Sequence, residues 1–448
     1  MVGAATCCLN HARISRPRVE CSSKTINAIE LSRGLLQMAR LVIGITGPIG
    51  SGVSTIADAF AANGFKKMRI SEAIREEEEK RVAHEPGARR RTLQDIGNEF
   101  RVRDPAHWVK RILELHGVLR QGEICDKEND LVIDSIRNLH EVKELMHRFA
   151  PNFFLIAVQA SRDIRWRRLK AEYADHENDF DRDDARDTDE DLDHGQQVDR
   201  CVQFADYVLV NEADQDAARL GHYQAWKNLP SDVELMRAAH EYGVHNNARP
   251  AEAAEVAMAI AYAQSHQSAC LKRYVGAAIV SRSGMTLAVG FNENPTPMLP
   301  CKTLFGACYK DTEMERSLEA RRDVHCPKCG FKNEALRKPY QCPNCAENLK
   351  LYFFPSRNME ICTAIHAEER AIRSLGSLSA EGATLYCTTF PCFQCARYIV
   401  DAGISNVVYV EAYPVKQSFD FLRANNVQVS PFQGFKARAF NLVFKQMR

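Results

Sequence analysis

The stretch "LVIGITGPIGSGVSTIADAFAANG", from Leu41 to Gly64, decides how the first half of the chain folds. "LVIGIT" is a short apolar run, which is typical of a buried parallel strand. A glycine-rich loop follows, and "VSTIADAFAANG" has the pattern of a helix that ends at its glycine. Strand, glycine loop and helix in this order predict a parallel sheet with helices.

The loop between this strand and helix differs by one residue from a phosphate-binding P-loop. Gly47 and Gly52 keep the spacing of the pattern and Ser54 follows, but Val53 stands where the pattern has lysine. The backbone N–H groups around Gly47, Gly50 and Gly52, at the start of a helix, still favour an anion. Without the point charge of the lysine we expect nucleotide binding rather than fast phosphoryl transfer.

Further apolar runs extend the predicted parallel sheet. They are "DLVIDSIRN", which carries Asp134 at its end, "NFFLIAVQAS" and "FADYVLVNEAD". Asp134 and the Ser54 hydroxyl are candidate ligands of Mg²⁺ with a bound nucleotide. Arginines that follow the second run are candidates to replace part of the missing charge; they are Arg165, Arg167 and Arg168.

Composition is that of a soluble globular protein with two or three domains. The 448 residues are 45% hydrophobic and 26% charged, and no apolar run is long enough to span a membrane. The net charge of +1 argues against an extended polyanion-binding groove. Sixteen cysteines without a secretory signal indicate a reducing cytoplasm. The acidic stretch 175–193 is predicted to be a solvated loop, because so many carboxylates are costly to bury.

After residue 228 the pattern changes to a second α/β unit with different connections. "VGAAIVSRSGMTLAVGFN" predicts two strands around a turn, "HAEERAIRSLG" a helix, "ATLYCTTF" a strand and "CARYIVDAG" a helix. We predict a parallel-sheet domain followed by an α/β/α domain with a cysteine-rich insertion. The predicted boundaries are a tail at 1–37, a first domain at 38–228, a linker at 229–250 and a second domain at 251–448, with the insertion at about 301–357.

"HAE", His366 to Glu368, followed by "PCFQC", which contains Cys392 and Cys395, predicts a catalytic zinc site. One histidine and two thiolates give Zn²⁺ three protein ligands and leave a fourth tetrahedral position open. The thiolates begin a helix, whose N-terminus favours their ionised form. Glu368 is near enough to move protons without binding the metal. This pattern is the signature of zinc nucleobase deaminases.

A second metal signal lies in the insertion. Two Cys-x-x-Cys pairs fill all four positions of a tetrahedral zinc and leave no position for substrate, so we predict a structural site. Its ligands are Cys326, Cys329, Cys342 and Cys345. Cys301 and Cys308 are not assigned as ligands, and Cys362, one helical turn before the histidine of the first site, is predicted to be a small buried hydrophobe.

From about residue 251 the chain resembles the deoxycytidylate deaminase group of the cytidine deaminase superfamily. "VGAAIV", "GFNENP", "HAEERAI" and "PCFQCARYIVDAGISNVVY" appear in that order. The resemblance implies that Asn292 binds the deoxyribose and that Ala367 and Phe390 offer backbone contacts to the pyrimidine. It places Tyr413 near the sugar and base, while a strand-end core tyrosine is an equal alternative.

Residues 38–214 resemble the P-loop nucleoside monophosphate kinases. The whole arrangement is similar to two-domain deoxycytidylate deaminases of bacterial antiphage defence. That resemblance implies cytoplasmic enzymes that deplete dCTP and dCMP, homo-oligomers, and in some members restraint by a small RNA, for which the sequence itself shows no site.

The leading expectation is therefore zinc-dependent hydrolytic deamination of free deoxycytidine nucleotides, dCMP or dCTP, to deoxyuridine nucleotides, with a regulatory first domain that binds a nucleotide. An RNA or DNA base editor is an alternative, but it would want a basic surface. A nucleotide-sensing interaction module with a spent deaminase is another, against which the intact Glu368 argues. For the first domain, a decayed scaffold and a live kinase with a displaced lysine, Lys66 or Lys67, stay open.

Overall fold

The computed structural model describes most of the chain after its first 40 residues. The described residues are 41–79, 89–188, 195–212, 229–238, 249–337, 340–345, 349, 361–411 and 416–444. The predicted tail at 1–37, part of the predicted linker and part of the insertion lie outside them.

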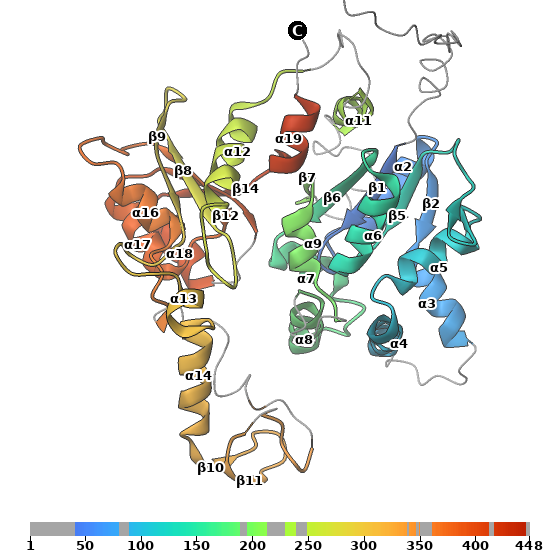
Figure 1. The fold of residues 1–448 in the computed structure, drawn as a ribbon, viewed down its shortest axis with the longest axis horizontal. Helices are drawn as coiled ribbons and strands as arrows, with labels where there is room; N and C mark the ends of the chain where they lie inside the picture. The colour runs from blue at the N-terminus through green and yellow to red at the C-terminus, as the bar shows by residue number, and fades with distance from the viewer. Residues whose placement is uncertain are drawn as a thin grey trace, which may run out of the picture. The chain divides into compact units, whose positions relative to one another are not determined.

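The first half of the chain forms a largely parallel sheet, as its sequence predicts (Figure 1). The strand order is β15-β7-β6-β1-β5-β2, and every neighbouring pair is parallel except β15 with β7. The strands are β1 (Val42–Thr46), β2 (Lys66–Arg69), β5 (Leu131–Asp134), β6 (Phe153–Gln159), β7 (Tyr207–Val210) and β15 (Gly434–Phe435).

Helices join these strands, and the first of them starts directly after the glycine loop. A short antiparallel pair, β3 (Leu119–Arg120) with β4 (Glu123–Ile124), precedes β5. The helices are α2 (Val53–Ala62), α3 (Ile70–Glu79), α4 (Arg89–Arg103), α5 (His107–Leu115), α6 (Leu139–Phe149), α7 (Arg162–Leu169), α8 (Glu177–Thr188), α9 (Val198–Phe204) and α11 (Leu229–Ala238).

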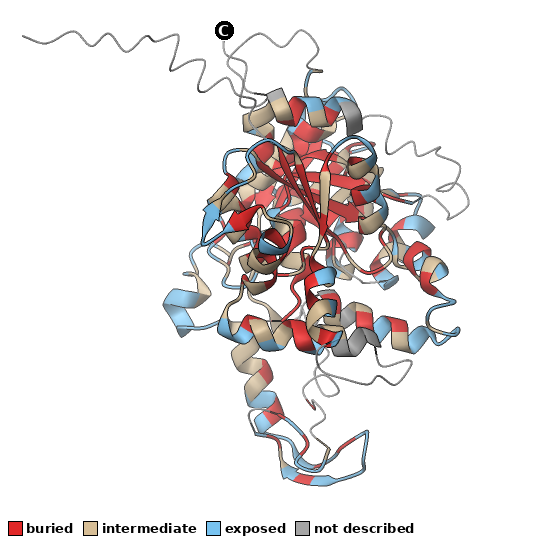
Figure 2. Ribbon diagram, turned by 90° about the vertical axis from the view of Figure 1, so that its right-hand side faces the viewer, coloured by how far each residue is buried: buried red, intermediate tan, exposed pale blue. Residues whose placement is uncertain are grey.

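Burial explains why these strands read as continuous apolar runs. Every residue of β1 and of β5 is buried, and so are the first six residues of β6. Figure 2 shows the buried residues concentrated in the strands, with mixed burial in the helices around them. A parallel sheet covered by helices on both faces excludes water from both sides, so its strands need apolar residues throughout.

The second half forms a mixed sheet of order β14-β13-β12-β8-β9. β12, β13 and β14 are parallel to one another, whereas β8 is antiparallel to β12 and β9. The strands are β8 (Gly276–Val280), β9 (Thr286–Phe291), β12 (Thr384–Thr389), β13 (Asn406–Glu411) and β14 (Gln428–Pro431).

Helices cover both faces of this second sheet, as predicted. Along β8, Ala277 and Ile279 pack in the core that contains α16 and α17, while Ala278 packs in the core that contains α12. This alternation follows from the two-residue period of a strand. The helices are α12 (Ala253–Ser265), α16 (Ala367–Arg373), α17 (Phe393–Asp401) and α18 (Lys416–Ala424). The last helix, α19 (Ala437–Val443), packs instead in the core of the first sheet through Ala439.

The predicted insertion leaves this sheet after β9. It contains α13 (Cys301–Phe305), α14 (Tyr309–Glu319), and the antiparallel pair β10 (Arg322–His325) with β11 (Lys332–Ala335). Figure 1 shows α14 leading from α13 to that pair. The insertion has a small core of its own, to which Met314, Leu318 and Cys326 contribute.

The end of the chain returns to the first sheet. Phe435 of β15 pairs with Tyr207 of β7, and their rings meet edge to face with centroids 5.0 Å apart. The Arg438 guanidinium forms an ion pair with Asp206, directly before β7. A strand from the C-terminus therefore completes the N-terminal sheet.

The acidic stretch folds differently from its prediction. Residues 177–188 form α8, and Asp187 in it is fully buried. Arginines neutralise these carboxylates: Arg165 lies 2.5 Å from Asp184, and Arg137 pairs with Asp187. The prediction of a solvated loop is wrong for this segment, because the partners that make burial tolerable are distant in sequence.

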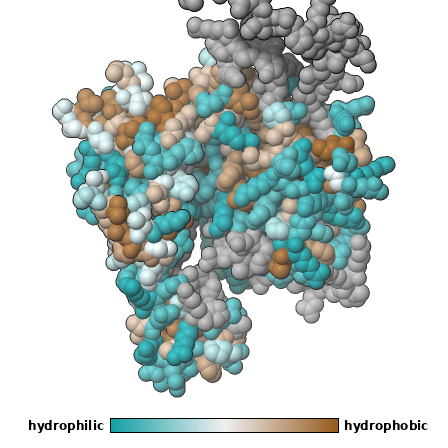
Figure 3. All heavy atoms as spheres, viewed as in Figure 1, coloured by the Kyte–Doolittle hydropathy of each residue, from teal (hydrophilic) through white to brown (hydrophobic). Residues whose placement is uncertain are grey.

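The described surface has no helix that is both long and apolar enough to cross a bilayer. On the face drawn in Figure 3, hydrophobic side chains lie in small groups among hydrophilic ones. Scattered groups of this kind are normal on a protein surface.

The contact between β9 and α16 allows a test of the second sheet's packing. A Cβ on Gly290 would lie 2.2 Å from the Ala367 carbonyl oxygen and 2.5 Å from the Ala371 nitrogen. Both are backbone atoms that cannot rotate away, so we expect Gly290→Ala to lower the free energy of unfolding by about 3 kcal/mol. Urea denaturation measures this loss.

The matched control is Gly284→Ala, in the turn between β8 and β9. Its φ of 86° disfavours a side chain, but a Cβ there meets nothing within 4 Å. We expect a loss of about 1 kcal/mol from backbone strain alone. Equal losses in the two variants would contradict the close packing of α16 on β9.

Candidate functional site

Three predicted metal ligands come together where two helices begin. His366 is the residue before α16 and Cys392 the residue before α17, whose first turn contains Cys395. The Nδ1 atom of His366 lies 3.3 Å from the sulfur of each cysteine. The three ligand atoms all lie within 4.8 Å of one another, so this set fits one tetrahedral zinc ion with a fourth position open.

The end of β12 places the two cysteines. Thr389 is the last residue of the strand, Phe390 and Pro391 follow, and the chain then turns into α17. The Cys395 N–H donates to the Cys392 sulfur at 3.5 Å, as in a side-chain N-cap. A helix N-terminus therefore favours negative charge at this sulfur.

The charges of the three ligands depend on one another. Hydrogen bonds from the Cys395 thiol and from His366 lower the pKa of Cys392 to about 4. Cys395, paired with that thiolate and buried, has a pKa well above its usual value. Burial would lower the pKa of His366, but the Cys392 contact and the Glu368 charge raise it to about 9. A cation at the centre of the cluster would relieve this competition for protons.

Glu368 lies beside the cluster, in the first turn of α16. Its Oε2 is 3.7 Å from the Cys395 sulfur, and only 4% of the residue is exposed. Burial raises the pKa of this carboxyl to about 7. A carboxyl in this position is suited to exchange protons with a reactant at the open metal position.

The four cysteines of the insertion form a second cluster. Sulfur atoms of Cys326 and Cys345 lie 3.7 Å apart and those of Cys329 and Cys342 3.6 Å apart, with all four within 4.8 Å. One Cys-x-x-Cys pair follows β10 and the other follows β11 along the chain. The geometry fits a closed Cys₄ zinc site without an open position.

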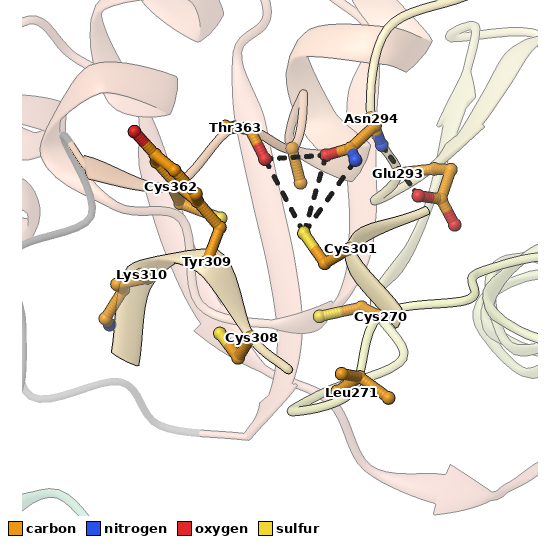
Figure 4. Close-up of a pocket in the computed structure, with 11 residues that line it drawn as sticks. Cys270, Leu271, Glu293, Asn294, Cys301, Cys308, Tyr309, Lys310, Cys362 and Thr363 are labelled. Atoms are coloured by element: carbon orange, nitrogen blue, oxygen red, sulfur yellow. Dashed lines mark hydrogen bonds between the residues drawn. The ribbon is translucent and has the colours of Figure 1, made fainter. Parts of the chain in front are cut away.

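Cys270, Cys301, Cys308 and Cys362 line one pocket between the second sheet and the insertion (Figure 4). The Cys301 sulfur is 3.6 Å from the Thr363 hydroxyl, and burial raises the pKa of the Cys362 thiol. Among the described residues, two clusters each have all their ligand atoms within 4.8 Å, namely the His366 cluster and the Cys326 cluster. The four cysteines of this pocket do not form a third cluster of that kind. Cys270 gave no signal in the sequence, because its neighbours here come from residues 301–362.

The expected substrate residues lie around the first cluster, except for Tyr413, which is outside the described residues. Ala367 follows a ligand and Phe390 precedes one, and both are buried. Asn292, directly after β9, is 8% exposed; its amide donates to the Arg273 carbonyl at 3.0 Å and accepts the Val275 N–H at 2.7 Å. Both ends of the Asn292 side-chain amide therefore form hydrogen bonds with the protein backbone, and its predicted contact with deoxyribose stays a prediction.

The glycine loop has a geometry that only glycine permits at two positions. A Cβ on Gly47 would lie 2.3 Å from the Val158 carbonyl oxygen, and a Cβ on Gly52, with φ of 99°, would lie 2.3 Å from the Asn211 amide nitrogen. Gly50 also has a positive φ of 76°. The Ser51 hydroxyl is buried, and no described residue of the chain forms a hydrogen bond with it.

Asp134 and Ser54 meet beside this loop, as expected for residues at the ends of β5 and the start of α2. The Ser54 hydroxyl donates to the Asp134 carboxylate at 3.3 Å. Two cations share that carboxylate: Arg69 at 2.9 Å, which the sequence analysis missed, and Lys67 at 3.5 Å. Lys66 instead pairs with Asp126, away from the loop. Arg69 ends β2, the strand beside β5, so only the strand order places it at the site.

The arginines of α7 bind the loop's carbonyl groups. Arg168 donates to the carbonyl oxygens of Gly50 at 3.0 Å and Asn211 at 2.9 Å, and Arg165 donates to that of Ile49 at 3.1 Å. These contacts hold the loop's backbone in place, while the charge of Arg165 is balanced by its ion pair with Asp184. Arg167 lies on the same helix.

Comparison with known proteins identifies the region that carries the first cluster. The profile of the cytidine and deoxycytidylate deaminase zinc-binding region matches residues 251–411. Similar curated proteins include the deoxycytidylate deaminase of Saccharomyces cerevisiae, 30% identical over 39% of this chain and 43% of that protein. The deoxycytidylate deaminase of Enterobacteria phage T2 is 28% identical over 39% of this chain and 90% of its own length. Residues 251–411 thus match the zinc-binding region of this deaminase type, and the chain spans under half of the length of the yeast relative.

Another similar protein is a UPF0200 protein of Methanothermobacter thermautotrophicus, 27% identical over 46% of this chain and 94% of its own length. Among solved structures, the dCMP deaminase of cyanophage S-TIM5 in apo form is 23% identical over 40% of this chain and 96% of that chain, with a TM-score of 0.24. Because that score is low, the functional conclusions below depend on the sequence relatives and on the site itself.

The two cysteine-containing clusters predict two zinc ions per chain. We expect Cys395→Ser and Cys342→Ser each to reduce the zinc content by about one ion, because each removes a thiolate from a different tetrahedral set. Elemental analysis of the purified variants measures this content. Cys201→Ser, at a buried thiol outside both clusters, is the control; a wild-type chain with a single zinc would contradict the assignment.

Proposed function

We propose that this protein catalyses the zinc-dependent hydrolytic deamination of a free deoxycytidine nucleotide to the deoxyuridine nucleotide. The observation that carries the proposal is the buried Glu368 carboxyl, 3.7 Å from a cysteine of a three-ligand cluster. A purely structural zinc site would be closed by a fourth ligand and would have no use for a buried acid of raised pKa beside it.

The chain's residues divide the reaction between them. His366, Cys392 and Cys395 would hold the metal, which when bound supplies a Lewis acid that makes water a nucleophile at neutral pH. As the water oxygen bonds to the ring carbon, Glu368 accepts one water proton and passes it to the adjacent ring nitrogen, and it then moves the second proton from the oxygen to the exocyclic amine. The carbon–nitrogen bond then breaks and ammonia leaves.

A nucleotide is the proposed substrate because two relatives named deoxycytidylate deaminase are 30% and 28% identical to this chain over 39% of its length. The near-neutral net charge of the chain offers no bulk attraction for a polynucleotide. Ammonia release from dCMP, dCTP, cytidine and CMP tests the substrate class, and salt-dependent polynucleotide binding with no release from free nucleotides would favour a base editor instead.

Replacing the proposed proton-transfer residue gives the sharpest test. We expect Glu368→Ala to lower the rate of ammonia release by about 10²–10⁴-fold with unchanged zinc content, because the variant loses general acid–base catalysis but no metal ligand. Glu369→Ala is the matched control, because the carboxylate of Glu369, next in the chain, pairs with Arg373 at 3.4 Å. Near-normal release by the Glu368 variant would refute the role.

We propose further that the first half binds a nucleotide through the glycine loop and regulates the deaminase. Three features of the loop support this role: its backbone opens α2, the buried Ser51 hydroxyl has no hydrogen-bond partner among the described residues, and arginines of α7 donate to its carbonyl groups. A phosphate would find N–H donors and positive charge there. Because Arg69 and Lys67 already neutralise Asp134, the proposal does not include Mg²⁺.

A short series of contacts joins the loop to the zinc cluster. Gly47 packs on the Val158 carbonyl, and the next residue, Gln159, donates through its amide to the Val410 carbonyl at 2.6 Å. Val410 precedes Glu411, whose carbonyl accepts the N–H of Phe390 at 2.9 Å, two residues before Cys392. A change at the loop therefore has a direct route to the strand that positions the cysteines.

The biological setting in the proposal comes from the resemblance of the two-part arrangement to antiphage deaminases. Depletion of deoxycytidine nucleotides in the cytoplasm of an infected cell is the proposed role, carried out by a homo-oligomer. Infection of cells that carry wild-type or Glu368→Ala protein tests it, because protection by the inactive variant would rule out a role through deamination.

The regulatory proposal makes a separate prediction. We expect Gly52→Asp to abolish the binding of dNTPs or dNMPs to a Glu368→Ala background in calorimetry, since the added side chain meets Asn211 and repels phosphate. Gln159→Ala should keep that binding but reduce the effect of the bound nucleotide on deamination. Gln267→Ala, at an exposed position just after α12, is its control. If Gly52→Asp and Gln159→Ala both left deamination and its response to nucleotide unaltered, regulation through the contacts from the loop to Phe390 would be refuted.

A further inference from the structure

Arg370 lies one helical turn after His366 in α16 and contacts the segment that follows β9. Its Nε donates to the Phe291 carbonyl at 2.9 Å. One terminal nitrogen donates to the carbonyls of Glu293 at 2.9 Å and Asn294 at 3.3 Å. The guanidinium carbon also lies 4.9 Å from the centre of the Phe291 ring.

These carbonyls bracket Asn292, the expected deoxyribose contact. The Asn292 carbonyl itself accepts the Ser268 hydroxyl at 2.6 Å, so side chains bind every carbonyl from residue 291 to 294. Phe291 ends β9, and residues 292–294 continue beyond the strand, where these side chains supply hydrogen bonds to the backbone carbonyls.

The same segment runs beside the residues that lead into the zinc cluster. Glu293 and Ile365 exchange two backbone hydrogen bonds, of 3.2 Å and 3.0 Å, and Ile365 is the residue before His366. The Thr363 hydroxyl donates to the Asn294 side chain at 2.8 Å. Arg370 therefore connects α16, which carries Glu368 and follows His366, to the side of this two-stranded contact formed by residues 291–294.

We propose that Arg370 is a positioning residue for substrate: it fixes Asn292, and with it the sugar of the nucleotide, relative to Glu368. The inference rests on the proposed function. The planar guanidinium can reach three carbonyls and stack on a ring at once, which neither a lysine ammonium nor a neutral side chain can do. No metal ligand touches Arg370 through its side chain in the contacts above, so its effect is on substrate binding and not on zinc.

The test separates KM from kcat. We expect Arg370→Met, which keeps an unbranched aliphatic side chain but removes the guanidinium, to raise the KM for dCMP or dCTP at least about tenfold, with kcat within about threefold of wild type and full zinc content. The KM of Arg370→Lys should lie between those of wild type and of the Met variant, because an ammonium group can still donate some of the hydrogen bonds to these carbonyls. Arg373→Met, at an exposed position on the same helix, should match wild type.

Calorimetry of dCMP with Glu368→Ala and with Glu368→Ala/Arg370→Met reads binding without turnover. We expect the double variant to bind dCMP about tenfold more weakly than Glu368→Ala. This comparison needs no turnover, so it remains informative if wild-type protein releases no ammonia, a result that would overturn the proposed function. An unchanged KM and affinity in the Met variant would overturn the positioning role. Loss of zinc from the Met variant, or a fall in its kcat at constant KM, would also overturn the positioning role. If the Met variant does not fold, KM, kcat and zinc content of the Lys variant decide the question.

Discussion

Two helix N-termini meet at the zinc cluster, and the second half of the protein is arranged to bring them together. His366 starts one helix and Cys392 the other, and their ligand atoms lie 3.3 Å apart. The first helix is pressed on β9 at Gly290, where a side chain would not fit, and the second follows directly from the end of β12. The sheet therefore sets the distance between the ligands, and a shift of either helix would separate them.

The glycine loop of the first half has the glycine spacing of a P-loop but lacks its lysine. Val53 supplies no cation where a P-loop has lysine, yet the surroundings are rich in positive charge. Arg168 and Arg165 bind carbonyls of the loop from one side, while Arg69 and Lys67 share the Asp134 carboxylate. Cations engaged in this way can hold an anion in place but are not free to follow a phosphoryl group in transfer, which agrees with binding rather than kinase chemistry.

The two halves are connected by more than a linker. A C-terminal strand completes the N-terminal sheet, and Lys436, beside it, is buried with its amine donating to the Val202 carbonyl at 2.6 Å. Arg249, just before α12, pairs with Asp232 of α11 and Glu255 of α12. Buried ion pairs of this kind tolerate little displacement, because a separated partner would leave an uncompensated charge. The C-terminal segment is thus held to the first sheet by direct contacts.

The sequence by itself determined the features that depend on near neighbours in the chain. The strand before the glycine loop, the helices that begin at His366 and Cys392, and the three-ligand set were all predicted, because periodicity and ligand spacing are local properties. Tertiary structure decided the rest. The acidic stretch is a helix because Arg137 and Arg165 neutralise it, Arg69 reaches Asp134 because β2 lies beside β5, and Arg370 reaches the segment after β9 because α16 packs on that strand. Each of these contacts joins residues that only the fold brings within hydrogen-bond distance, and no local pattern records such a pairing.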